Sequence, residues 1–174
     1  MTQPFDLLQN AIAQLLGTDA GFPGFYLSDD PGEVPGDFDG QIPVLARRPR
    51  KVENDLVAAI SATGLAAWVM PPVPEQTVRT VSATLFYSRV NVTLRVFEVP
   101  ALNQTGWDIY DALWMIPRIL HWTTYSDPSG RLLTQKPLQV SDRPAELIER
   151  ASLEDLQGVE AKVANLFFDC AMAG

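Results

Sequence analysis

The chain has 174 residues, of which 47% are hydrophobic and 20% charged, so it has a globular composition and the length of one ordinary domain. Its 14 Pro and 11 Gly are too few for a collagen-like or low-complexity protein. With 13 Lys and Arg against 21 Asp and Glu, the net charge is −8. Binding to nucleic acid depends on neutralising phosphates, so general DNA or RNA binding is not expected, although a local basic patch stays open.

Cysteine content and hydropathy point to a reducing compartment away from membranes. The single cysteine, Cys170, has no second thiol for an intramolecular disulfide. The opening sequence MTQPFDLLQN has no basic region followed by an apolar run, so no secretory signal is expected. No apolar run approaches the ~18 residues of a membrane span.

Residues 4–16 predict an amphipathic helix. Phe5, Leu8, Ile12 and Leu15 recur at steps of three or four and therefore share one face. Gly17 suits the position just after the helix.

Residues 17–50 form an unusual stretch with six Gly and five Pro. We expect a long Pro/Gly-rich acidic loop or arm at about 18–50, because these residues interrupt every regular pattern. Between Gly17 and Gly40 there are six acids and no base: Asp19, Asp29, Asp30, Glu33, Asp37 and Asp39. Residues 18–40 are therefore hypothesised to be an interaction arm, with candidate anchors Phe22, Phe25, Tyr26 and Phe38. Asp37-Phe38-Asp39-Gly40 favours a solvated acidic turn, with weak cation binding as the alternative.

The charge then reverses in a basic cluster that comprises Arg47, Arg48, Arg50 and Lys51. These four residues are candidate contacts for an acidic protein partner, and a solvated loop is the alternative interpretation.

The middle of the chain predicts a helix followed by strands. Residues 52–63 fit a helix that ends at Gly64, and residues 65–70 fit a strand that Pro71-Pro72 terminates. Residues 77–99 alternate between apolar and polar positions, most clearly from Val90 to Val96. They predict two antiparallel strands with a tight turn near Ser88–Arg89.

Residues 106–121 predict a third helix. Ile109, Leu113, Ile116 and Leu120 form one stripe, and Pro117 should kink or divide the helix. Trp107, Tyr110 and Trp114 broaden the stripe. Together with Trp122 they favour a core or subunit-interface face, with ligand stacking as the alternative.

The C-terminal third offers a turn and two segments. Asp127-Pro128-Ser129-Gly130 predicts a turn, and residues 132–140 fit an edge strand because they contain Pro137. Ser152-Leu153-Glu154-Asp155 has the form of a helix start, whereas the alternation after Gly158 favours a strand.

A search for chemistry gives no catalytic, metal-binding or cofactor-binding residues. His121 is the one histidine, and we expect it at a helix C-terminus. Cys170 sits in an apolar context and should be buried. There is no G-x-S-x-G elbow and no glycine-rich phosphate loop, and one Cys with one His is too few for a zinc site.

The order of elements carries a family resemblance. A helix ending in Thr63-Gly64-Leu65 leads into Ala67-Trp68-Val69-Met70-Pro71-Pro72, then a strand, then Glu98-Val99-Pro100-Ala101-Leu102-Asn103 and a helix ending in Leu120-His121-Trp122. The chain resembles the tail terminator (tail-completion) proteins of tailed phages and prophages. The family's last segment is a strand, which favours β structure over 158–170.

The alternation at Val90–Val96 between amphipathic helical patterns predicts a single α/β (α+β) domain over residues 1–174, with a mainly antiparallel sheet flanked by amphipathic helices, and the resemblance agrees. The resemblance implies a structural virion protein, not an enzyme, assembled in the host cytoplasm into the tail or neck. Such a protein would form a homo-oligomeric ring, a hexamer, that caps the tail tube. Its partners would be the tail tube protein, the head–tail connector or neck protein, and the sheath protein in a contractile tail, without membrane or specific nucleic-acid binding and without a cofactor. The alternatives are another neck, connector or adaptor subunit of the virion, or a small-ligand-binding protein or enzyme that uses His121.

Overall fold

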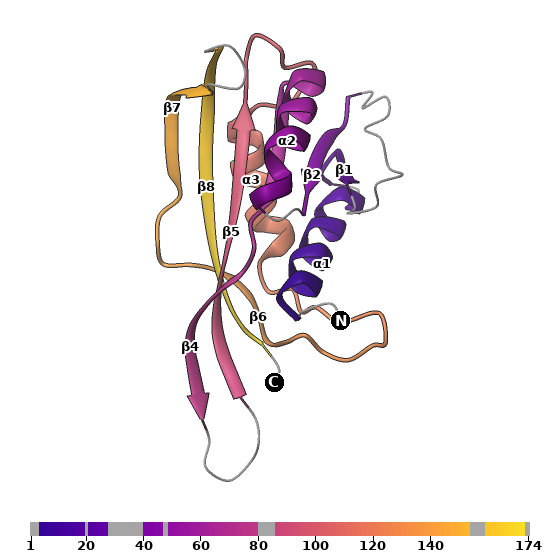
Figure 1. Cartoon of the computed structure of the whole chain (residues 1–174), viewed down its shortest axis with the longest axis vertical. Coiled ribbons are helices and arrows are strands. Elements are labelled where there is room, and N and C mark those ends of the chain that lie inside the picture. The colour runs from indigo at the N-terminus through magenta and orange to yellow at the C-terminus, as the bar shows by residue number, and fades with distance from the viewer. Residues whose placement is uncertain are drawn as a thin grey trace.

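The computed structural model describes residues 4–19, 21–27, 40–46, 49–79, 86–153 and 159–172, and it has a mixed α/β fold. Three helices and one eight-stranded, mainly antiparallel sheet make up the described part (Figure 1). The helices are α1 (Pro4–Thr18), α2 (Pro49–Thr63) and α3 (Ile109–Leu120). The strands are β1 (Gly24–Leu27), β2 (Ile42–Leu45), β3 (Leu65–Val69), β4 (Val73–Arg79), β5 (Phe86–Glu98), β6 (Thr134–Val140), β7 (Glu146–Leu153) and β8 (Val159–Met172).

Two long strands, β5 and β8, form the centre of the sheet. They pair antiparallel from Ser88 opposite Met172 to Glu98 opposite Lys162. The main strand order is β1-β2-β3-β5-β8-β6, while β4 pairs with the first half of β5 and β7 with the first half of β8. β1, β2 and β3 run parallel to one another and lie toward one edge.

Helices cover both faces of the sheet. Leu8, Ile12 and Leu16 of α1 and the buried side of α3 join one apolar cluster with alternate residues of the central strands. Ile60 of α2 joins a second cluster with Trp68 and others on the opposite face, and Figure 1 shows α2 and α3 on opposite sides of the sheet. The strands of the covered region are therefore apolar on both faces.

The period-two pattern at the centre of the sheet is confirmed. Val90, Val92, Leu94 and Val96 are fully buried, and they face α1 and α3. The predicted turn near Ser88–Arg89 is wrong, because these two residues lie inside β5 and pair with Thr77 and Gln76 of β4. The chain between β4 and β5 lies outside the described residues.

The prediction of a loop or arm at about 18–50 is wrong in part. β1 and β2 form a parallel pair inside this stretch, with Leu27 opposite Leu45. The strands are only four residues long, so their alternation is too short to be recognised among the glycines and prolines. Gly17 belongs to the last turn of α1, where a side chain would overlap the backbone of Tyr26.

Predictions for the remaining elements are mostly confirmed. The turn at Asp127–Gly130 closes with a hydrogen bond from Gly130 N to the Asp127 carbonyl (2.9 Å), and β6 is an irregularly paired edge strand around Pro137. The final segment is the strand β8, as expected. Ser152 and Leu153 end β7 rather than open a helix, and α3 is not divided at Pro117.

No helix in the part of the chain that the structure describes is long and apolar enough to cross a membrane.

Candidate assembly surface

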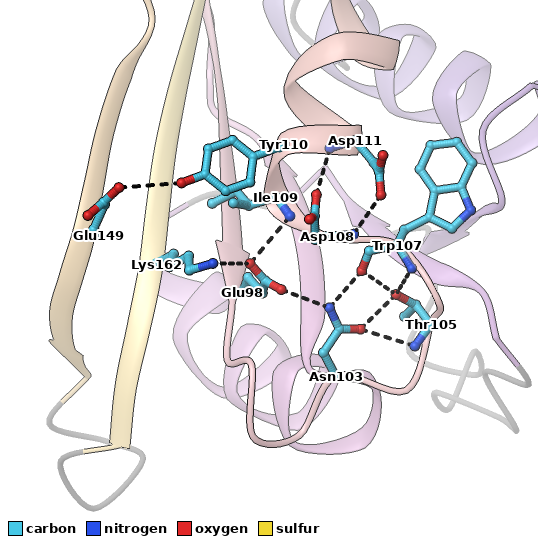
Figure 2. A network of polar contacts seen from close by, with 10 residues as sticks. All are labelled: Glu98, Asn103, Thr105, Trp107, Asp108, Ile109, Tyr110, Asp111, Glu149 and Lys162. Atoms are coloured by element: carbon cyan, nitrogen blue, oxygen red, sulfur yellow. Dashed lines mark hydrogen bonds and ion pairs between the residues drawn. The ribbon is translucent and has the colours of Figure 1, made fainter.

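A polar network fixes the start of α3 against the sheet (Figure 2). Glu98, at the end of β5, is only 4% exposed. Its carboxylate accepts hydrogen bonds from Asn103 Nδ2 (3.0 Å) and from the backbone N–H of Ile109 (3.3 Å). Lys162 Nζ of β8 lies 3.5 Å from the same carboxylate. Burying a carboxylate costs free energy unless hydrogen bonds and ion pairs offset the loss of water. Three partners do so for Glu98.

Asn103 organises the turn that leads into α3. Its amide donates to the Trp107 carbonyl (2.7 Å), and its Oδ1 accepts from the backbone N–H and the hydroxyl of Thr105 (3.1 and 2.8 Å). Asp108 then caps the helix through a reciprocal pair of hydrogen bonds with Asp111. The hydrogen bonds of the Glu-x-Pro-x-x-Asn stretch at 98–103 therefore fix the orientation of α3.

Thr63-Gly64, from the end of α2, meets this same turn. Val99 N donates to the Gly64 carbonyl (2.7 Å), and Gln104 N donates to the Thr63 carbonyl (3.1 Å). Gly64 has a φ of +76°, and a Cβ there would overlap the backbone of Asn103. Two of the stretches that carry the family resemblance are thus in direct contact.

α3 buries the stripe predicted by the sequence, but not all of the aromatic residues expected to broaden it. Ile109, Ala112, Ile116 and Leu120 are buried. Tyr110 and Trp114 are 48% and 66% exposed, so the prediction that they belong to the core of the subunit is wrong. Their interface alternative stays a prediction.

Basic side chains accompany the exposed aromatic residues of α3. The Lys162 ammonium lies 5.3 Å from the centre of the Tyr110 ring, and the Arg118 guanidinium lies 5.4 Å from that of Trp114. Tyr110 also donates a long hydrogen bond to Glu149 of β7 (3.4 Å). These contacts are of cation–π type at a surface site.

The row of exposed aromatic residues continues past the end of α3. His121 caps α3, and the next residue, Trp122, has a φ of +65° and is 64% exposed. The two rings meet edge to face at 5.4 Å. His121 Nδ1 accepts a hydrogen bond from the backbone N–H of Val140 (3.2 Å), which is itself 45% exposed.

We call this continuous surface the aromatic ridge, and it consists of Tyr110, Trp114, Arg118, His121, Trp122 and Val140. Pro117, Arg118, His121 and Val140 line a shallow groove of about 480 Å³ within it. Aromatic residues and arginine are the residue types that contribute most to protein interfaces. The ridge is therefore a candidate assembly surface.

The interaction residues predicted from the sequence lie elsewhere. Phe22 is 1% exposed and packs edge to face on Trp107 at 5.9 Å, so it is a core residue and the prediction of a surface anchor is wrong for it. Phe25 and Tyr26 belong to β1 and are half-buried, and the Tyr26 hydroxyl reaches Asn10 of α1 (3.4 Å).

The other interaction residues predicted from the sequence are Phe38 and the basic cluster. Phe38, Arg47 and Arg48 lie outside the described residues, while Arg50 and Lys51 are placed in the first turn of α2 by their backbone alone. Their proposed contacts stay predictions.

Cys170 and His121, the two residues considered for chemistry, both have defined surroundings. Burial, with a smaller effect of Asp169, raises the pKa of the Cys170 thiol to about 12, so the thiol stays protonated at neutral pH. Among the described residues no cluster of three or more His, Cys, Asp or Glu could hold a metal ion. His121 contacts a tryptophan ring and a backbone N–H rather than a nucleophile.

Comparison with known proteins supports the fold. No protein-family model matches the sequence, and no curated protein matches it. One solved structure with a similar chain is described as the virion of a native gene transfer agent (GTA) particle. The similarity covers 97% of this chain and 96% of that one, at 17% sequence identity and a TM-score of 0.50. At this identity the similarity shows a shared fold.

Proposed function

We propose that the chain is a structural virion protein of the tail-terminator type. It forms a ring of identical subunits that caps the tail tube and joins it to the head connector, without catalysing a reaction. The observation that carries this proposal is the shared fold over nearly the full length of both chains, because the other chain belongs to a virion particle. The order of elements that resembles tail terminators supports the particular place in the particle.

The aromatic ridge supports an assembly role independently of that similarity. Trp114 and Trp122 expose 66% and 64% of their surface, which is costly in a subunit that stays alone in water. Exposed tryptophans beside an arginine are typical of an interface that another protein covers.

A second candidate is another neck, connector or adaptor subunit of the same kind of particle. The similar chain is described only by the particle as a whole, so its description is compatible with either position. Binding to isolated tail tube protein separates the two, because only a tube-capping ring contacts the last tube subunits directly.

The proposal is tested by measuring the molar mass of the purified chain with light scattering over a range of concentrations. Electron microscopy of the largest species and a pull-down with tail tube protein complete the test. We expect a hexamer-sized ring that binds tube ends. A chain that stays monomeric at all concentrations and does not bind tube protein would contradict the proposal.

A further inference from the structure

Trp122 has a backbone conformation that residues with a side chain rarely adopt. It occupies the position just after the C-cap of α3, where a φ of +65° favours glycine. Its backbone N–H donates to the Leu138 carbonyl (2.7 Å), so the turn joins α3 to β6. A tryptophan in this conformation strains the backbone and leaves its indole exposed, so it does not stabilise the isolated subunit. This indicates that the indole serves to bind another molecule.

The ridge also has a charge preference. Arg118 supplies a permanent positive charge within it. The only carboxylate that the described contacts place against the ridge is Glu149, beside Tyr110 at its far end, and none lies between Arg118 and Trp122 in the sequence. Apolar rings beside a guanidinium fit a partner segment that carries both carboxylates and an apolar side chain.

This chain contains a segment of that composition. Residues 28–39, which connect β1 to β2, contain five of the six acids between Gly17 and Gly40, no base, and Phe38. β1 is the first strand in the sheet order, whereas the ridge contacts β7, β8 and β6 through Glu149, Lys162 and Val140. The two complementary features therefore belong to opposite edges of the molecule.

Distance argues against contact within one copy. A segment of a dozen residues that is attached at both ends extends at most about 20 Å from its attachment points. Crossing from β1 to β8 takes four strand spacings, about 19 Å, and α1 and α3 cover the intervening face of the sheet. The maximum extension of the segment therefore barely equals the distance across the sheet, and it is too short to pass around α3 to the ridge.

We propose that the aromatic ridge of one subunit binds the acidic segment 28–39 of the neighbouring subunit. This inference rests on the proposed ring. Complementary surfaces at opposite edges make a head-to-tail interface, and repetition of such an interface closes a ring when the rotation between subunits permits. Each subunit offers one ridge and one acidic segment, so every interface in the ring is the same.

Two defective variants test this pairing. The ridge variant carries Trp114→Ala and Trp122→Gly, of which the second suits the backbone at that position and should preserve the fold. The acid variant replaces its carboxylates by amides of similar shape: Asp29→Asn, Asp30→Asn, Glu33→Gln, Asp37→Asn and Asp39→Asn. Ile148→Ala, at a 50% exposed position on β7, and Asp142→Asn serve as matched controls.

Molar mass is measured by light scattering for each protein alone and for an equimolar mixture of the two variants. We expect the unmodified chain and the controls to form rings, and each defective variant to associate at least about thirtyfold more weakly. The mixture should give one-to-one dimers and no rings, because it restores a single working interface.

The outcomes separate this inference from the proposed function. Rings formed equally well by both variants, or a mixture that stays monomeric, would overturn the pairing while the unmodified chain still forms rings. Loss of assembly in the ridge variant alone would also overturn it and point to another occupant, such as tube protein. A monomeric unmodified chain would instead contradict the proposed ring itself.

Discussion

Substituting Gly64 by alanine tests the contact between the end of α2 and the turn before α3. Gly64 has a φ of +76°, and an added Cβ would overlap Asn103 N and Cα, which belong to a backbone segment held by its own hydrogen bonds. Gly106 has nearly the same φ, +77°, but a Cβ there would meet nothing within 4 Å. Gly106→Ala is therefore a matched control for backbone strain without overlap.

The expected difference follows from these two environments. An alanine in the left-handed region costs about 1 kcal/mol, and this cost is common to both variants. Gly64→Ala must in addition displace the turn and break the hydrogen bonds from Val99 N and Gln104 N, at about 1 kcal/mol each. We expect the free energy of unfolding to fall by about 3 kcal/mol for Gly64→Ala and by about 1 kcal/mol for Gly106→Ala.

The assay is equilibrium unfolding in urea, monitored by tryptophan fluorescence and circular dichroism at a concentration where the subunits are monomeric. Equal losses of stability in Gly64→Ala and Gly106→Ala would refute the reasoning. Such a result would mean that the turn at 98–104 moves aside freely and does not orient α3.

Three other predictions concern the core, the pH dependence and the charged surface. Leu94→Asp should give insoluble or unfolded protein, because it places a carboxylate at a fully buried position of β5; a soluble variant with an unchanged melting temperature would contradict this. Burial raises the pKa values of Tyr125 and Cys170, so the folded chain keeps protons that the unfolded chain releases first. The free energy of unfolding should therefore fall as the pH rises from about 9 to about 12, with a shallower fall for Tyr125→Phe. Finally, the chain should bind duplex DNA only weakly, and submicromolar binding abolished by charge reversal of the basic cluster would contradict the expected protein partner of Arg47, Arg48 and Arg50.

The sequence predicted best the elements whose burial repeats over many residues. β5 is long enough for its alternation to be unambiguous, and Gly64 marks the end of α2 correctly through its left-handed backbone. β8 was ambiguous from local pattern, and its strand structure depends on pairing with β5, a contact distant in sequence. β1 and β2 depend on β3 in the same way.

The buried face of α3 follows from the sequence, but its width does not, because the neighbouring face also carries large apolar residues. Ile109, Ile116 and Leu120 repeat at helical spacing, and so do Tyr110 and Trp114 one position later. Periodicity alone cannot distinguish a buried face from an interface. The sequence groups Trp122 with these residues, and its position directly after a helix, which favours glycine, is a further signal that it serves an interface.

The structure also narrows the hypothesised interaction arm. Deleting residues 19–39 would remove β1 and the buried side chains of Phe22 and Leu27, so the monomer would not keep its fold. The hypothesis of an interaction arm therefore applies to residues 28–39 alone. Replacing their acids, as in the acid variant above, leaves β1 and the core intact.

The location of the protein in an assembled particle tests the central claim most directly. Purified particles would carry a small tag fused to the protein at the exposed turn Asp127–Gly130, and gold labelling would be followed by electron microscopy. We predict label at one end of the tail tube only, where the tube meets the head. Absence of the protein from the particles, or label along the whole tube, would contradict the proposed tube-capping ring.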